Sequence, residues 1–191
     1  MKRSNLGMGL ARFVGDRRGA ALVEFAILSP LLVLLYLGTV EATSAVRAYL
    51  KLNAAAQTYA DLIANQPSIT TTSLANYCAG AKLVFFPLSS TQLSIAAASV
   101  SNTSGTKAQD WHDTSNCGAG VASITGLTLA SCPGTNCLIP NSGDSAIVVQ
   151  AKYTYTSFLH YVLPITQTFT QVASARPRQN AKIPCSNCTA N

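Results

Sequence analysis

The first strong pattern along the chain is an apolar run that follows a basic segment. From Ala20 to Val40 the sequence reads AALVEFAILSPLLVLLYLGTV, and Glu24 is the only charged residue in it. These 21 residues would form a helix ~31 Å long, which matches the ~30 Å hydrocarbon core of a bilayer. The run therefore predicts one membrane-spanning helix over residues 20–41.

Beyond the run, apolar residues continue at helical spacing. They recur in steps of three and four, which predicts an amphipathic helix over residues 42–66 with one face packed on a domain. The proline at position 67 ends it, because the residue before a proline is displaced from helical geometry. The residues of the predicted inward face are Val46, Tyr49, Leu52, Ala56, Tyr59 and Ile63.

The rest of the chain has the pattern of short strands. Pro67–Thr72 is a turn-rich link, Asn76–Gly80 a short helix and Ser101–Gly120 a polar loop. In the first predicted strand Leu93, Ile95 and Ala97 share one face. An antiparallel sheet of three or four strands packed on the helix gives an α+β domain over residues 67–184, followed by a tail over 185–191. The predicted strands are Gln92–Val100, Val121–Leu129, Ala146–Thr156 and Thr166–Ala175.

Charge sets the direction of the helix across the membrane. Residues 1–19 carry five basic side chains and one acidic, a net +4, whereas the rest of the chain carries eight basic and six acidic, a net +2. The positive-inside rule then keeps residues 1–19 in the cytoplasm as a leader and places the domain outside. The basic balance is thus a topology signal and does not predict nucleic-acid binding. A cleaved secretory signal fits the sequence less well, because the apolar region of an ordinary signal peptide spans only ~7–15 residues and the run in this chain is longer.

Six cysteines all lie beyond the apolar run, in the part assigned to the oxidising side of the membrane. An even number there predicts disulfide bonds, and six cysteines allow about 15 pairings. The turn Pro133–Asn136 favours a bond between Cys132 and Cys137. The Cys185–Cys188 pair lies in a polar tail, which favours a local structural disulfide over a redox motif. The disulfide candidates are Cys78, Cys117, Cys132, Cys137, Cys185 and Cys188.

The sequence contains no constellation typical of an enzyme. His112 and His160 lack the spacing of zinc ligands, so we expect neither a metal nor another cofactor. No nucleophile and base stand out as a pair. Trp111-His112-Asp113 is interpreted as a packing segment, and the apolar stretch Phe158–Leu163, with Tyr161, as a candidate contact surface.

The residues around the start of the apolar run resemble a known family. Arg17-Arg18-Gly19-Ala20-Ala21-Leu22-Val23-Glu24-Phe25, then a leucine run interrupted by Pro30 and closed by Glu41, is similar to the N-terminus of TadE/TadG-like minor pseudopilins. These proteins belong to the Tad (tight adherence, Flp-type) pilus machinery. The stretches Val148–Tyr153 and Gln171–Arg176 resemble the closing strands of the same family.

The resemblance implies a pilin-like fold and a defined processing event. In similar proteins a prepilin peptidase of the inner membrane cuts after the glycine, which here lies between Gly19 and Ala20. Glu24 would then stand at the fifth position of the mature chain, next to Phe25. The implied function is assembly of a pilus for surface adhesion. The implied partners are the peptidase, other pilin or pseudopilin subunits, Tad assembly proteins and the lipid bilayer, without nucleic acid.

Physical reasoning supports these roles separately. A cut after Gly19 removes the net +4 leader, so that charge no longer pins the helix to the cytoplasmic face. A carboxylate inside a membrane helix is costly unless an opposite charge pairs with it. The N-terminal ammonium that the cut creates on a neighbouring subunit could form such an ion pair with Glu24. Arg17 and Arg18 would hold the cleavage site at the membrane surface through anionic head groups.

A second interpretation stays open. The chain would then be an unprocessed, single-pass, membrane-anchored binding module outside the cytoplasm, and Glu24 an interfacial residue at a helix N-terminus. The resemblance implies a bacterial inner membrane, with the N-terminus in the cytoplasm and a periplasmic domain that could be incorporated into a surface pilus. The sequence leaves open whether a pseudopilin of this kind would initiate, cap or line a pilus, or act as an assembly factor.

Overall fold

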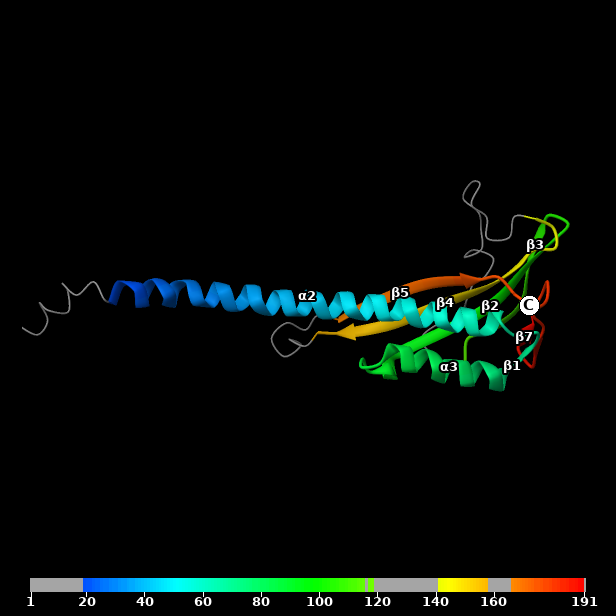
Figure 1. The fold of residues 1–191 in the computed structure, drawn as a ribbon, viewed down its shortest axis with the longest axis horizontal. Coiled ribbons are helices and arrows are strands. Elements are labelled where there is room, and N and C mark those ends of the chain that lie inside the picture. Colours follow the sequence, from blue (N-terminus) through cyan, green and yellow to red (C-terminus); the bar gives the residue numbers. More distant parts are fainter. Residues whose placement is uncertain (1–18, 116, 119–140, 158–165, 191) are drawn as a thin grey trace, which may run out of the picture. The chain divides into compact units, whose positions relative to one another are not determined.

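The computed structural model describes residues 19–115, 117–118, 141–157 and 166–190, and Figure 1 gives the course of the chain. The chain divides into two compact units, Met1–Thr43 and Ser44–Asn191. Helix α2 (Ala20–Ala64) contributes its first part to one unit and the rest to the other. The predicted end of this helix before Pro67 is confirmed.

The second unit is built on a five-stranded sheet with the order β5-β4-β2-β3-β7. Every pair of neighbouring strands is antiparallel, as predicted. Strand β5 has the predicted bounds, β4 begins one residue earlier than predicted, and β2 begins one residue later and ends three residues later than predicted. The predicted strand Val121–Leu129 lies outside the described residues. The strands are β2 (Leu93–Thr103), β3 (Thr106–Asp113), β4 (Ser145–Thr156), β5 (Thr166–Ala175) and β7 (Thr189–Ala190).

The prediction of a loop over Ser101–Gly120 is wrong, because most of it forms the hairpin of β2 and β3. Thr103 pairs with Thr106, and the two residues between them, Ser104 and Gly105, both have positive φ. This is the geometry of a two-residue hairpin turn that matches the twist of the strands. Strand β3 was not predicted because its sequence is polar. It lies half-exposed toward the edge of the sheet, where a strand needs few apolar residues.

The helix predicted at Asn76–Gly80 is longer than expected. Helix α3 runs from Thr71 to Phe85, and its N-cap Thr70 accepts a hydrogen bond from the Ser73 backbone N–H at 3.1 Å. The predicted link Pro67–Thr72 therefore also contains strand β1 (Ile69–Thr70) and the first two residues of α3. Strand β1 pairs in parallel with β6 (Cys185–Ser186), and a 3₁₀ turn, η2 (Ser90–Gln92), precedes β2.

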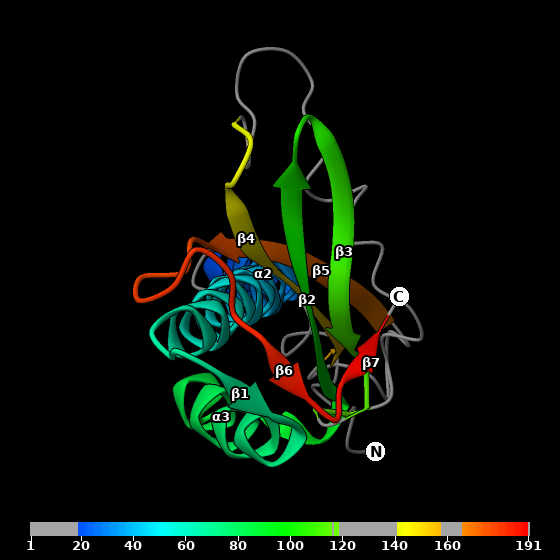
Figure 2. The ribbon, with the colours of Figure 1, turned by 90° about the vertical axis from the view of Figure 1, so that its right-hand side faces the viewer.

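The core of this unit lies between the two helices and one face of the sheet (Figure 2). The predicted face of β2, with Leu93, Ile95 and Ala97, is buried there. From the helices come the fully buried Leu52, Tyr59, Ile63, Leu74 and Phe85. The sheet is thus covered by helices on this face, as in an α+β layer.

The prediction of which residues form the inward face of α2 is partly wrong. Val46 is 57% exposed and Tyr49 is 46% exposed, whereas Ala48 is buried. Small residues form the start of the contact, because alanine lets the helix approach the sheet closely. Tyr49 instead touches the edge of the core, where its ring meets that of Phe169 edge-on at 6.0 Å between centroids.

Candidate functional site

The candidate site is the first part of helix α2, which belongs to the first unit. Ala20 is the first residue of the helix, and Glu24 and Phe25 follow within its second turn, both exposed. Glu24 makes no hydrogen bond or ion pair within the described part of the chain. Gly19 directly precedes the helix, and a Cβ added there would meet nothing within 4 Å. Arg17 and Arg18 lie outside the described residues.

The apolar side chains of this segment are exposed all round the helix. The window that qualifies as a membrane span has a mean hydropathy of 2.2 and is 0% buried. An apolar helix in the core of a soluble domain would bury these side chains, so that explanation does not fit. Its exposed large side chains are Leu22, Val23, Phe25, Ile27, Leu28, Leu31, Leu32, Val33, Leu34, Leu35, Tyr36 and Val40.

The side-chain hydroxyl groups in and just after this segment are satisfied inside the helix. Pro30 has no N–H, which frees the carbonyl of Ala26 four residues earlier. The Ser29 hydroxyl donates to that carbonyl at 3.4 Å. Thr39 and Thr43 likewise donate to the carbonyls of Tyr36 and Thr39, at 2.7 and 2.8 Å. Such internal pairing is what a helix in hydrocarbon requires.

Among the residues that the structure describes, two disulfides tie the second unit together. Cys78 of α3 is bonded to Cys117 beyond β3, with 5.4 Å between the Cα atoms. The local Cys185–Cys188 disulfide closes the turn between β6 and β7. Cys132 and Cys137, for which we expected a bond, lie outside the described residues.

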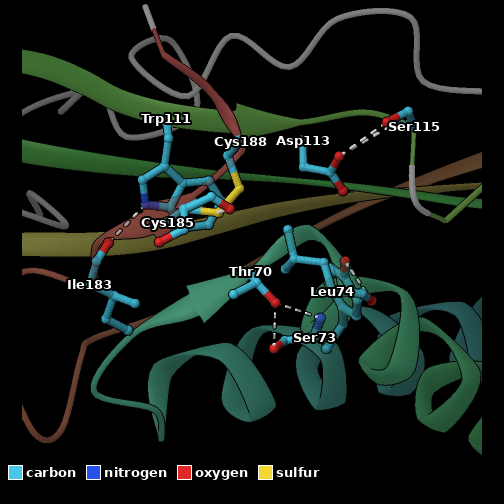
Figure 3. The surroundings of a disulfide bond; sticks show 11 residues. Thr70, Ser73, Leu74, Trp111, Asp113, Ser115, Ile183, Cys185 and Cys188 are labelled. Atoms are coloured by element: carbon cyan, nitrogen blue, oxygen red, sulfur yellow. Dashed lines mark hydrogen bonds between the residues drawn. A yellow bond between two sulfur atoms is a disulfide. The ribbon is translucent and has the colours of Figure 1, made fainter.

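Trp111-His112-Asp113 has a packing role in the structure. Trp111 lies beside the Cys185–Cys188 disulfide, and its indole N–H donates to the carbonyl of Ile183 at 2.8 Å (Figure 3). These contacts attach the C-terminal segment to the sheet. Burial, together with the charge of Asp113, raises the pKa of Tyr59 above its usual range.

Asp110 also holds the C-terminal segment against the sheet, through an ion pair with Lys182. It is the extra residue at a bulge, because Ser99 pairs with Trp111 and Val100 with Gln109. Its carboxylate accepts a hydrogen bond from Ser101 at 2.9 Å and forms an ion pair with Lys182. No cluster of three metal-ligating side chains occurs among the residues that the structure describes. His160 lies outside those residues.

Sequence comparison assigns the helix to a family. The model of the TadE-like protein family matches residues 19–61, a segment that begins at the glycine before α2 and ends three residues before the helix does. Neither a curated protein nor a solved structure matches the chain. The predicted resemblance is therefore confirmed over helix α2, where the chain is similar to TadE-like proteins, which are associated with Tad pili.

Proposed function

We propose that this protein is a minor pseudopilin that takes part in assembly of a Tad-type pilus for surface adhesion. The observation that carries the proposal is the coincidence of two boundaries. The match to the TadE-like family begins at residue 19, and helix α2 begins at Ala20. A peptidase cut between Gly19 and Ala20 would thus leave a mature chain that starts with the helix itself.

The energetics of insertion support a membrane-spanning role for the first part of α2. It contains 12 Leu, Ile, Val and Phe residues between Ala20 and Val40. At roughly 0.3–0.6 kcal/mol each, they favour insertion by about 4–7 kcal/mol. One acidic residue costs about 3 kcal/mol at the centre of the membrane and less near its edge. The segment therefore tolerates one carboxylate and still inserts.

The second part of α2 argues against complete removal of the helix. Residues such as Leu52 and Ile63 are fully buried in the core of the second unit. A signal peptidase that cut near Ala45 would leave a charged terminus next to this core, whereas a cut after Gly19 leaves helix α2 whole. The leader, residues 1–19, would be lost and the apolar part of α2 retained.

Glu24 would act when subunits associate. The cut creates an ammonium group at Ala20, and an acidic side chain one turn into a neighbouring helix can pair with it in lipid. Loss of the basic leader would at the same time remove the charge that holds the helix at the cytoplasmic face. The subunit would begin in the inner membrane with a periplasmic domain and leave it for a surface pilus. Other pilin-like subunits and the prepilin peptidase would be its partners.

Cleavage is tested by the variant Gly19→Ala in the native host. A Cβ at this position meets no other atom of the described chain, so the change leaves the fold intact. We expect the wild type to give a mature chain that starts at Ala20 by intact mass, and Gly19→Ala to accumulate as the larger precursor. Retention of residues 1–19 in the wild type, with an active peptidase present, would refute the processing step.

The role of Glu24 is tested by Glu24→Gln, which keeps the shape and removes the charge. We expect export and processing to continue and piliation to fall, as we also expect for Glu24→Ala. Glu41→Gln is the matched control, because Glu41 is the next acidic residue on the same helix. Equal piliation in the Glu24 variants and the wild type would contradict the pairing role and favour an uncut membrane anchor.

A further inference from the structure

The second unit carries exposed apolar side chains around the end of helix α3. Leu83 is 77% exposed and Phe86 is 73% exposed, and Leu50 on α2 is 58% exposed. A groove of about 490 Å³ lies next to them, lined by Leu50, Pro87 and Leu88 among others. We call Leu50, Leu83, Phe86 and this groove the α2–α3 patch.

The patch is held in place by ordered contacts. Phe85 is buried, and its ring packs on Tyr153 with 4.7 Å between centroids, whereas the next residue, Phe86, faces outward. The backbone N–H of Phe86 donates to the carbonyl of Leu83 at 3.2 Å, and the Lys51 ammonium donates to the carbonyl of Val84 at 3.1 Å. The exposure of Phe86 is therefore fixed by the fold. Contiguous exposed apolar side chains of this kind mark an interaction surface.

The surroundings of the patch are basic. Arg47 and Lys51 line the groove, and Lys82 precedes Leu83 on α3. The stretches 44–60 and 71–88, which form this part of the surface, contain no Asp or Glu. Apolar side chains flanked by cations match a phospholipid surface, where phosphates lie outside the acyl chains.

The chain itself keeps the patch close to a membrane. Ser44, which also lines the groove, follows Val40 by four residues. Both residues lie within helix α2, where four residues rise ~6 Å, and head groups extend the bilayer by roughly 5–7 Å on each side. A span that ends near Val40 therefore leaves the edge of the α2–α3 patch at Ser44 within reach of the head groups.

We infer that the α2–α3 patch docks on the outer face of the bilayer that α2 crosses. Leu83 and Phe86 enter the edge of the acyl layer, and Arg47 and Lys82 contact lipid phosphates. Docking holds the domain against the membrane until the subunit leaves it. The inference rests on the membrane-spanning role proposed for α2, and its test separates the two.

The test uses the full chain in vesicles of phosphatidylcholine and phosphatidylglycerol with brominated acyl chains, which quench tryptophan on contact. Trp111 is only 4% exposed and serves as a constant background. Phe86→Trp reports on the patch. Val172→Trp on β5 is the control, because Val172 is an exposed apolar residue of the same unit, at 43%, outside the α2–α3 patch. We expect quenching of Phe86→Trp to exceed that of Val172→Trp by at least about twofold.

A third variant, Leu31→Trp, reports on insertion of the helix. Strong quenching of Leu31→Trp with no excess quenching of Phe86→Trp over the control overturns docking and leaves the span standing. Absence of quenching for Leu31→Trp overturns the span and the docking together. Shielding of Phe86→Trp from acrylamide in native membranes, without quenching by brominated lipid, shows a protein on the patch and also overturns the inference.

The charge requirement is tested separately in the Phe86→Trp background. Arg47→Glu with Lys82→Glu should reduce the excess quenching to the level of vesicles that lack phosphatidylglycerol, because the lost cations no longer attract the anionic lipid. These two side chains lie on the surface, outside the core of the unit. Unchanged quenching in the double variant overturns the assignment of Arg47 and Lys82 to lipid phosphates.

Discussion

Removal of the Cys78–Cys117 disulfide should cost the second unit a large part of its stability. The two cysteines are separated by 39 residues along the chain. Closing a loop of that length lowers the entropy of the unfolded chain by an amount worth about 4 kcal/mol at 25 °C. Both sulfur atoms are also buried in the core, where their loss leaves a small cavity. Domains of this size are stable by only about 5–15 kcal/mol.

The assay is urea unfolding of the full chain in detergent micelles, followed by the fluorescence of the buried Trp111. We compare the wild type with Cys78→Ala/Cys117→Ala and expect a much lower midpoint. The matched control is Cys185→Ala/Cys188→Ala, in which the cysteines are three residues apart. The same relation gives about 2 kcal/mol for so short a loop. If the control variant loses as much stability as the first, loop closure is not the source of the stabilisation and the reasoning fails.

Two further predictions concern the core and the turns. Burial and the charge of Asp113 raise the pKa of Tyr59 above its reference value of 10.0, so folding disfavours the tyrosinate. The neutral Tyr59 side chain therefore contributes its full stability below pH 10, and this contribution is lost as the pH rises further. In Tyr59→Phe the free energy of unfolding, measured from about pH 8 to 11, should fall less steeply with pH than in the wild type. It should cost about 1 kcal/mol at neutral pH through the lost hydrogen bond to the carbonyl of Leu74. Gly118→Ala should destabilise, because its φ is +85° and the new Cβ would lie 2.7 Å from the carbonyl oxygen of Leu93. Gly80→Ala, inside α3, meets only Leu62 at 3.5 Å and should raise the melting temperature slightly; equal effects of the two glycine changes would contradict this account.

The helix that carries the candidate site could be predicted from the sequence because its signals are local. The apolar run, the single Glu24 within it and the basic residues before it are consecutive along the chain. Length and composition alone then predict a helix that can span a membrane, and the structure has that helix. The start of helix α2 at Ala20 and its end at Ala64 follow from the same local signals.

Most of the sheet could be predicted from local sequence patterns. Alternation of apolar residues marked β2, and β-branched and aromatic residues marked β4. Strand β3 was missed because Thr106–Asp113 carries polar and charged residues that the edge of a sheet tolerates. The signal that would have found it is the Ser104-Gly105 pair, a two-residue turn between segments that can pair.

The sequence by itself determined the apolar helix, its single acidic residue and the α+β class, because each depends on neighbours along the chain. The local Cys185–Cys188 disulfide was predicted from the sequence, whereas the tertiary structure alone decided that Cys78 meets Cys117 across 39 residues. It also decided that Val46 and Tyr49 leave the inward face of α2, and that Phe86 is exposed beside the buried Phe85. These outcomes depend on how two helices pack on one sheet, and a periodic pattern in one segment carries no information about the shape of its partner.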